Sequence, residues 1–419
     1  MPPYHILALN SGSSSLKFAQ YEFSSPKERP DEHIDERPDG RPDERLIARG
    51  EAEGIGAQDG RVWLHGGEGN SIADERISIP DHQSALRIVL DRLKRGNYAA
   101  PSAIGHRLVN GGPRYRSPQR ITPQLLADLR DLIPLAPLHL PAEIKIVEAV
   151  ASEDPRIPQV ACFDTAFHRR LPELAQRFPL PRKLFDEGIR RYGFHGLSYE
   201  YCLRELGTAA KQRRLIIAHL GNGASLAAIK DGAPLDTSMG LTPTGGIVMG
   251  TRSGDLDPSI LIYLLREKGY DAATLERMID LESGLLGVSE QSSDMKTLLA
   301  KRSSDARAGE AVTMFCRSVR KEIGAFAAVL GGVDMLVFTG GIGERAPEVR
   351  KEICRDLGHL GIALDDAGND ATQEVISSAG SACEVRVIAT NEELMIARHT
   401  REVAFGNPGR TRADPPPID

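Results

Sequence analysis

Cysteine is scarce in this sequence, and long apolar runs are missing altogether. The five cysteines are scattered over 419 residues without C-x-x-C spacing, which argues against a disulfide framework and a cysteine zinc site. No run of about 18 apolar residues is available to cross a membrane, and the N-terminus carries no charged-then-apolar leader. We therefore expect a cytoplasmic protein with reduced thiols and no membrane partner.

Positive charge is also in short supply. The chain has 52 Lys and Arg residues against 58 Asp and Glu residues, a formal net charge of −6, so it lacks the basic footprint of a protein with a nucleic-acid partner. Hydrophobic residues at 41% and charged residues at 26% are ordinary for a globular protein. The length favours two domains over one core, and any anion site must be a local pocket of positive charge.

Short apolar runs alternate with amphipathic segments over much of the chain, which predicts the α/β class. Helices are expected at 83–95, 122–131, 141–151, 308–329, 346–357 and 391–403. Strands are expected at 5–9, 16–23, 103–109, 158–162, 214–220, 224–229, 334–339 and 384–389. The strand, polar turn and strand of residues 5–20 share their layout with residues 215–230, which hints at two similar halves.

Residues 24–45 differ from the rest of the chain. Arg-Pro-Asp repeats begin at Arg29, Arg37 and Arg41 and make this tract charged and poor in apolar side chains. Such a segment cannot offset the entropy lost on ordering, so we predict a disordered insertion between two strands. Residues 407–419 carry four prolines and are expected to form a loose tail.

Residues 236–258 are too rich in glycine to bury a helix or strand face. The run holds five glycines, several threonines and a single arginine, Arg252. Many backbone N–H groups, hydroxyls and one fixed positive charge are suited to binding an oxyanion or a phosphate.

Three further segments have a similar character. Asn10–Lys17 is a serine-rich turn ending in a lysine, although it lacks the spacing of a Walker A loop. His195 lies between two glycines, which favours close approach of a ligand over a structural histidine. Residues 331–344 are predicted to form a strand, a glycine turn and a helix, suited to a nucleotide but without the G-x-G-x-x-G of a Rossmann dehydrogenase.

Charged residues at the ends of predicted strands are candidates for chemistry. Arg107 precedes a Gly-Gly loop near a strand end, where α/β proteins bind ligands; the alternative is a surface arginine on an edge strand. Asp164 follows the strand at 158–162, where it could hold Mg²⁺ or cap a short helix.

Two predicted helix starts carry capping patterns. Asp257 before Pro258 is expected to cap a helix. Thr390 and Glu393 match a capping box, which gives Glu393 a structural role and leaves Glu392 as the metal-site candidate.

Together these segments resemble the acetate kinase family, within the acetate and sugar kinase/Hsp70/actin superfamily. The resemblance spans nearly the whole chain, from Leu9 to Ala397. It is strongest in Met249-Gly-Thr-Arg-Ser-Gly-Asp-Leu-Asp-Pro258, Tyr192-Gly-Phe-His-Gly196, Phe163-Asp-Thr-Ala-Phe-His168 and Phe338-Thr-Gly-Gly-Ile-Gly-Glu344.

The resemblance implies two duplicated ribonuclease H-like (actin-like ATPase) domains with a cleft between them. Residues 1–165 with 391–419 would form the acyl-side domain, and residues 166–390 the nucleotide-binding and dimerisation domain of a homodimer. The implied reaction is Mg²⁺-dependent (or Mn²⁺-dependent) in-line transfer of the γ-phosphoryl of ATP to acetate, giving ADP and acetyl phosphate. Acetate is ionised at pH 7, so catalysis would rest on holding two anions together and stabilising the transferring phosphoryl.

Residue roles follow from the matched motifs. The implied catalytic residues are Arg107, Asp164, His195 and Arg252. The implied substrate-binding residues are Arg107, Val109, Leu138, His139, Phe194 and Pro243. The implied nucleotide-binding residues are Lys17, His219, Leu220, Gly221, Asn222, Gly223, Asp294, Met295, Lys296, Gly340, Gly341, Ile342 and Gly343. Asn10 and Glu392 would serve the metal, and Ser13 and Ser15 match other active-site positions.

Some positions depart from the family pattern. Its usual histidine, asparagine, threonine, histidine and arginine are replaced here by Asn110, Leu140, Leu197, Tyr199 and Lys296, and a bulkier pair by Thr244-Gly245. Several of these flank the acyl or base pocket, so propionate or another short-chain acid remains an alternative to acetate. A non-catalytic ATP-binding module is a further alternative, against which the set of charged candidates argues.

Overall fold

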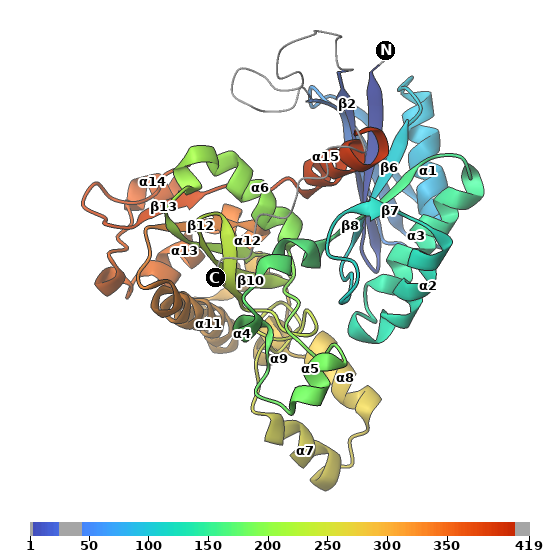
Figure 1. Ribbon diagram of the computed structural model, residues 1–419. Coiled ribbons are helices and arrows are strands. Elements are labelled where there is room, and N and C mark those ends of the chain that lie inside the picture. Colours follow the sequence, from blue (N-terminus) through green and yellow to red (C-terminus); the bar gives the residue numbers. More distant parts are fainter. Residues whose placement is uncertain (1–2, 25–43, 407–419) are drawn as a thin grey trace. The chain divides into compact units, whose positions relative to one another are not determined.

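The computed structural model describes residues 3–24 and 44–406 and divides into two compact units (Figure 1). Unit 1 combines Met1–Ala166 with Glu392–Asp419, and unit 2 is Phe167–Asn391. The predicted tail and most of the predicted insertion lie outside the described residues. The boundary at 45 was wrong, because Glu44 and Arg45 already belong to a strand and form ion pairs with Arg398 and Glu22.

Unit 1 is built on an eight-stranded sheet in the order β5-β4-β3-β2-β1-β6-β8-β7. The strands are β1 (Tyr4–Ser11), β2 (Ser15–Phe23), β3 (Glu44–Glu53), β4 (Gly60–Gly66), β5 (Ser71–Ile77), β6 (Ala103–Leu108), β7 (Gln119–Arg120) and β8 (Gln159–Phe163). β1 pairs antiparallel with β2 and parallel with β6, which pairs parallel with β8. The carboxyl ends of β1, β6 and β8 therefore lie at one edge of the sheet, the usual place for ligands.

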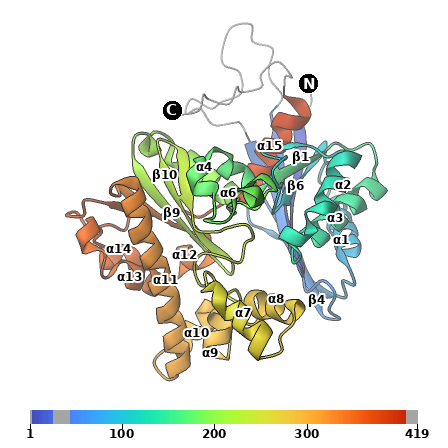
Figure 2. The same ribbon diagram turned by 60° about the horizontal axis from the view of Figure 1, so that its bottom comes forward.

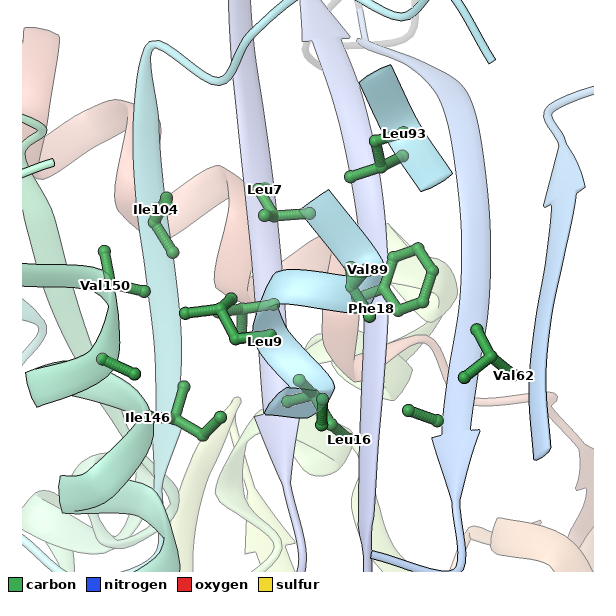
Figure 3. Close-up of a cluster of buried hydrophobic side chains, with 14 of the residues drawn as sticks. Leu7, Leu9, Leu16, Phe18, Val62, Val89, Leu93, Ile104, Ile146 and Val150 are labelled. Carbon is green, nitrogen blue, oxygen red and sulfur yellow. The ribbon is translucent and has the colours of Figure 1, made fainter. Parts of the chain in front are cut away.

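Helices cover both faces of this sheet. α1 (His82–Arg95) and α3 (Leu140–Glu153) pack on one face, with α2 (Pro123–Asp131) against α3, and α15 (Glu392–Phe405) packs on the other (Figure 1). Figure 3 shows the first interface, where strand side chains such as Leu9 and Phe18 meet Val89 and Ile146 from the helices. Alternation along β1 and β2 places these apolar side chains on one face.

Unit 2 contains a five-stranded sheet in the order β11-β10-β9-β12-β13. The strands are β9 (Arg214–Leu220), β10 (Ala224–Lys230), β11 (Ala233–Thr237), β12 (Met335–Thr339) and β13 (Glu384–Val387). The long helix α11 (Ala306–Leu330) runs along one face (Figure 2). α6 (Gly196–Leu206) packs on a second buried cluster with Leu215, Ile217 and Val337.

Smaller helices complete unit 2. They are α4 (Glu173–Gln176), α5 (Arg182–Asp186), α7 (Pro258–Glu267), α8 (Ala272–Leu281), α9 (Gly284–Ser289), α10 (Met295–Lys301), α12 (Gly340–Arg345), α13 (Pro347–Cys354) and α14 (Asp366–Asp370). Helices α7 to α10 gather at one end of the unit in Figure 2. In the described part of the chain, no helix is both long and apolar enough to span a membrane.

The two sheets repeat one pairing pattern. In unit 1 the run β3-β2-β1-β6-β8 has two antiparallel ladders followed by two parallel ones. In unit 2 the run β11-β10-β9-β12-β13 has the same sequence of ladders. The α/β class and the duplicated fold predicted from the sequence are confirmed.

The predicted helices and strands are all present, within a few residues at their ends. Four strands were not predicted: β4, β5, β7 and β11. No side chain of β5 is buried, which hides its period, whereas β4 alternates buried Val62 and Leu64 with more exposed residues. Helices α4 to α6, α8 to α10 and α14 were not predicted either, and only the start of α7 was. α7 has no buried residue, so the pattern of burial that marks a core helix is missing there.

Candidate active site

Arg107 is the centre of a buried cluster in unit 1. It lies near the end of β6, and Asp164 follows β8 directly, at the start of a short 3-10 helix (Asp164–Arg170). Arg107 donates to Asp164 from Nε at 3.1 Å and from Nη2 at 2.5 Å, and from Nη1 to Asn10 Oδ1 at 3.3 Å. Asp164 is fully buried and the Arg107 side chain is 14% exposed, so the guanidinium is held rigidly at the sheet edge.

The electrostatic environment keeps Arg107 charged. Burial alone would lower the pKa of Arg107, but the charges of Asp164 and Glu392 outweigh it and raise the pKa. Glu392 Oε2 lies 3.9 Å from Arg107 Nε. The group is a permanent cation for binding a carboxylate or phosphate.

Two glutamates at the start of α15 lie beside this cluster. Asn10 Nδ2 donates to Glu392 Oε2 at 3.3 Å and to Glu393 Oε1 at 3.4 Å. Burial raises the pKa of Glu392, and Glu393 raises it further, while Arg107 and Lys17 lower it. Lys17 pairs with Asn10 in the ladder of β1 and β2, which brings the predicted metal residues and Lys17 to one edge.

The capping box predicted for Thr390 and Glu393 was wrong. α15 begins at Glu392, one residue later than a cap at Thr390 requires. The buried Thr390 hydroxyl has no hydrogen-bond partner among the described residues, and Glu393 accepts from Asn10 instead. Both glutamates therefore belong to the polar cluster of unit 1.

Val109, a predicted acyl-pocket residue, is held by a carboxyl that the sequence analysis missed. Its backbone N–H donates to Glu143 Oε2 at 3.0 Å, and Val109 and Glu143 are both buried. Burial raises the pKa of Glu143 to about 8, against the lowering effects of Arg107 and this hydrogen bond. Leu138 and His139 directly precede α3, the helix that carries Glu143.

In unit 2 two of the predicted catalytic residues, Arg252 and His195, flank a glycine turn. Gly221–Gly223 joins β9 to β10, and Gly250 N–H donates to Asn222 O at 3.0 Å. A Cβ at Gly223 would lie 3.2 Å from Arg252 Nη1 and 3.5 Å from His195 Nε2. Arg252 Nη1 also donates to the carbonyl of Pro243 at 3.1 Å, so the turn, the 236–258 segment and the segment of His195 meet here.

Two histidines stack beside the same turn. The rings of His195 and His219 have centroids 4.3 Å apart and planes 19° from parallel. His195 has a left-handed backbone with φ 58°, which is uncommon outside glycine. Phe194, the residue before it, is buried, and its carbonyl lies 3.0 Å from His168 Nε2.

The predicted nucleotide loop, Gly340–Gly343, lies against the end of β9. Gly340 has φ 76°, and a Cβ there would lie 2.8 Å from the carbonyl oxygen of Leu220. Glu344 Oε1 accepts from the backbone N–H groups of Gly340 and Thr390, each at 3.0 Å. Glu344, whose role the sequence analysis did not identify, ties this loop to the segment leading into α15.

Asp294, Met295 and Lys296 stand apart from these contacts. Asp294 caps α10, accepting from Thr297 Oγ1 at 2.7 Å and Thr297 N at 3.1 Å. Met295 is buried and Lys296 is exposed, so their assignment to the nucleotide stays a prediction. Asp257 caps α7 with Pro258 in the first turn, as predicted.

The fold and these cation sites define a class. A duplicated α/β protein with arginines fixed beside a small-residue turn in each unit fits a phosphotransferase, which must neutralise phosphoryl charge. The model of the Acetokinase family matches residues 5–398, and the chain belongs to that family.

Relatives agree over almost the full length. The acetate kinase of Methylocella silvestris is 43% identical over 403 residues, covering 94% of this chain and 96% of the relative. The crystal structure of Porphyromonas gingivalis acetate kinase has a TM-score of 0.80 at 38% identity, covering 96% of this chain and all of the other. The structure of a propionate kinase from Francisella tularensis has a TM-score of 0.85 at 35% identity, with the same coverage.

Proposed function

We propose that this protein transfers the γ-phosphoryl of ATP to acetate, reversibly and in line, giving ADP and acetyl phosphate. The observation that carries the proposal is the space at Gly223, where a Cβ would lie 3.2 Å from Arg252 Nη1 and 3.5 Å from His195 Nε2. A glycine leaves that space to an oxyanion, which would meet a guanidinium and an imidazole together. Fixed donors of this kind stabilise charge that develops in the transition state.

The acceptor needs no general base, because acetate is already ionised at pH 7. Arg107 is the proposed partner of the acetate carboxylate, since Asp164 and Asn10 hold its guanidinium in place. The proposed contacts of the methyl group are Val109, Leu138, Phe194 and Pro243. His139 and Lys17 are proposed to contact the bound anions.

The proposed nucleotide contacts are His219, Leu220, the Gly221–Gly223 turn, Asp294–Lys296 and the Gly340–Gly343 loop. The glycines of both turns leave room for close approach of phosphate or base to the backbone. Ala218 and Phe338 pair in the parallel ladder of β9 and β12, which supports one shared nucleotide site for the two turns.

Mg²⁺ is the proposed metal, with Glu392 and Asn10 as the protein groups that would hold it. Oxygen donors fit this ion, which binds one or two carboxylates and completes its shell with phosphate oxygens and water. The described residues contain no group of three or more His, Cys, Asp or Glu side chains arranged for a metal, in keeping with an ion carried largely by the nucleotide. When bound, the ion supplies charge neutralisation at the β- and γ-phosphates.

A coupled assay of ADP formation tests the proposal directly. ADP should form with ATP, Mg²⁺ and acetate, and should not form when acetate is omitted. Arg107→Ala and Arg252→Ala should each lower kcat by about 100-fold or more, because each removes a fixed donor. Arg114→Ala is the matched control, since Arg114 is 71% exposed and pairs with Asp128.

Two outcomes of this assay would contradict the proposal. Equal ADP formation with and without acetate would identify a hydrolase, and no turnover with bound ATP would identify a non-catalytic ATP-binding module. Normal kcat in both arginine variants would place the chemistry elsewhere.

Propionate is the second candidate acceptor, favoured by the similarity to a propionate kinase. One methylene changes binding by only about 1–3 kcal/mol, so the ratio of kcat/KM for the two acids has to be measured. Val109→Ala and Pro243→Ala should shift that ratio towards propionate by opening space beside the methyl group. An unchanged ratio in both variants would place the acyl contacts elsewhere.

We further propose a cytoplasmic homodimer. Four apolar side chains on α7, Ile260, Ile262, Tyr263 and Leu265, are between 40% and 52% exposed. A second copy of the chain is the proposed cover for this face, because a patch of this kind is costly to leave in water.

A further inference from the structure

In the stacked histidines of unit 2, the Nδ1 atom of each ring contacts a serine hydroxyl. His195 Nδ1 lies 2.7 Å from Ser225 Oγ, and His219 Nδ1 lies 2.8 Å from Ser198 Oγ. The opposite nitrogens face the glycine turn: His195 Nε2 is 3.5 Å from a Cβ built at Gly223, and His219 Nε2 is 3.7 Å from one built at Gly221. Each ring is therefore anchored at Nδ1 and presents Nε2 to the turn.

A tyrosine extends one of these contacts. Tyr199 OH lies 2.5 Å from Ser225 Oγ, and Tyr199, Ser225 and Ser198 are fully buried. Tyr199 stands where the acetate kinase pattern has a histidine, so the chain Tyr199–Ser225–His195 is a feature of this sequence.

Charge repulsion disfavours protonation of these rings. Two imidazoles 4.3 Å apart would repel each other as cations, and Arg252 Nη1 approaches the same turn. A further imidazole, His168, has its ring centroid 5.7 Å from that of Tyr199. Burial lowers the pKa of His168 to about 4, so it is neutral as well.

A neutral imidazole carries one N–H, and its neighbours decide which nitrogen holds it. If Tyr199 O–H donates to Ser225 Oγ, the serine hydrogen points to His195 Nδ1, and the ring proton sits on Nε2. The Ser198 hydroxyl is itself a donor and can give its hydrogen to His219 Nδ1, with the same result for that ring. Both rings then donate Nε2–H towards the turn without being charged.

We propose that Tyr199, Ser225 and Ser198 are positioning residues that keep His195 and His219 in the neutral Nε2–H tautomer, as paired donors to phosphoryl oxygens. The inference rests on the proposed function, in which the Gly221–Gly223 turn binds phosphate. It makes phosphoryl transfer independent of imidazole protonation. No proton leaves either ring during turnover.

The test is the ratio of variant to wild-type kcat as a function of pH, which cancels any pH dependence that the enzymes share. Ser225→Ala should lose about tenfold in kcat at pH 8.5, as expected for weakening one fixed donor. The loss should shrink as the pH is lowered to about 5, below the ordinary pKa of histidine, where an imidazolium carries Nε2–H whatever its Nδ1 contacts. Tyr199→Phe and Ser198→Ala should show smaller losses of the same form.

Ring ¹⁵N NMR of the wild-type protein gives a readout besides activity. Histidine-selective labelling should show a protonated Nε2 and an unprotonated Nδ1 for both rings at pH 8, and a mixture for His195 in Ser225→Ala. Ser381→Ala is the matched control: its hydroxyl contacts Gly361 O and Cys383 O and no imidazole, so its ratio should not vary with pH.

The outcomes separate this inference from the proposed function. Full activity in His195→Ala would contradict the proposed function, because it would show that the phosphate does not bind beside His195. An inactive His195→Ala together with a pH-independent Ser225→Ala ratio would overturn the tautomer inference alone. A proton on Nδ1 in the wild-type spectrum would do the same.

Discussion

Glu143 is a carboxyl whose charge is set by burial. It lies in the first turn of α3, 1% exposed, with Oε2 on the Val109 N–H and Oε1 lacking a partner among the described residues. A pKa raised to about 8 means that the group is protonated at neutral pH. The polar cluster of unit 1 therefore gains no further negative charge beside Arg107 and Asp164.

This protonation makes stability depend on pH in a defined direction. Between 4.5 and about 8 the folded chain keeps the Glu143 proton and the unfolded chain has lost it, so stability falls as pH rises through that window. The expected slope is about 1.4 kcal/mol per pH unit for one proton. Above pH 8 this contribution is lost.

Glu143→Gln isolates the effect, because the amide oxygen still accepts from Val109 and carries no proton to lose. Urea unfolding between pH 5.5 and 7.5 should show the variant gaining on the wild type as pH rises. Parallel stability curves would show that Glu143 is ionised in the folded protein.

The charged candidate site residues could be predicted from the sequence, but the residues that hydrogen-bond to the candidates could not. Arg107, Asp164 and Glu392 stand at strand or helix ends in recognisable motifs, and the structure brings them into one cluster. Ser225 and Tyr199 lie within a strand and a helix, where a hydroxyl has no distinctive pattern. Glu143 could have been noticed, because it is an acidic residue within a predicted apolar helix.

At the scale of elements, α15 depends on a missing side chain in β6. A Cβ at Gly105 would overlap Thr400 Oγ1 and lie 2.6 Å from Ile396 Cγ2. Glycine at this position lets the helix lie directly on the strand. Because α15 begins with Glu392, the same contact positions the proposed metal ligand.

Gly105→Ala should therefore cost about 1–3 kcal/mol of stability through overpacking and raise the Mg²⁺ concentration needed for half-maximal activity. Chemical unfolding and a Mg²⁺ titration of activity measure the two effects. Gly324→Ala in α11 is the control, since nothing lies within 4 Å of its Cβ position and alanine favours a helix. Equal behaviour of the two variants would show that α15 does not pack tightly on β6.

Element boundaries set by side-chain contacts were beyond sequence reasoning. The pattern at Thr390 and Glu393 fits a capping box, yet Glu393 accepts a hydrogen bond from Asn10 instead of capping the helix. β5 was missed because it has no buried side chain and is defined by its pairing with β4. Tertiary context decided each of these local choices.

At the scale of the whole molecule, the two units share one order of strand pairing but differ in the residues of their turns. The turn after β1 is Gly12-Ser-Ser, and the turn after β9 is Gly221-Asn-Gly. The duplication was foreseen only in outline, because the matching hairpins share layout and little identity. The order of parallel and antiparallel strand pairs, which is the same in both sheets, shows the duplication directly.

The proposed dimer is tested at the same scale. Ile262→Asp should convert the dimer to a monomer on size-exclusion chromatography while the circular dichroism spectrum stays unchanged, because a charge would be desolvated in the contact. Ile72→Asp is the control, since Ile72 is similarly exposed and lies on β5 in unit 1. A wild-type monomer, or a variant that stays dimeric, would contradict the assignment of α7.

The ladder of β2 and β3 offers a use in protein engineering. Phe23 and Glu44 face each other as the last pair of that ladder, so the chain leaves and re-enters the sheet at neighbouring points. Each doubling of a flexible connection costs only about 0.6 kcal/mol. A fluorescent reporter whose own ends lie close together can therefore be spliced between Phe23 and Glu44, giving a labelled enzyme with both chain termini left native.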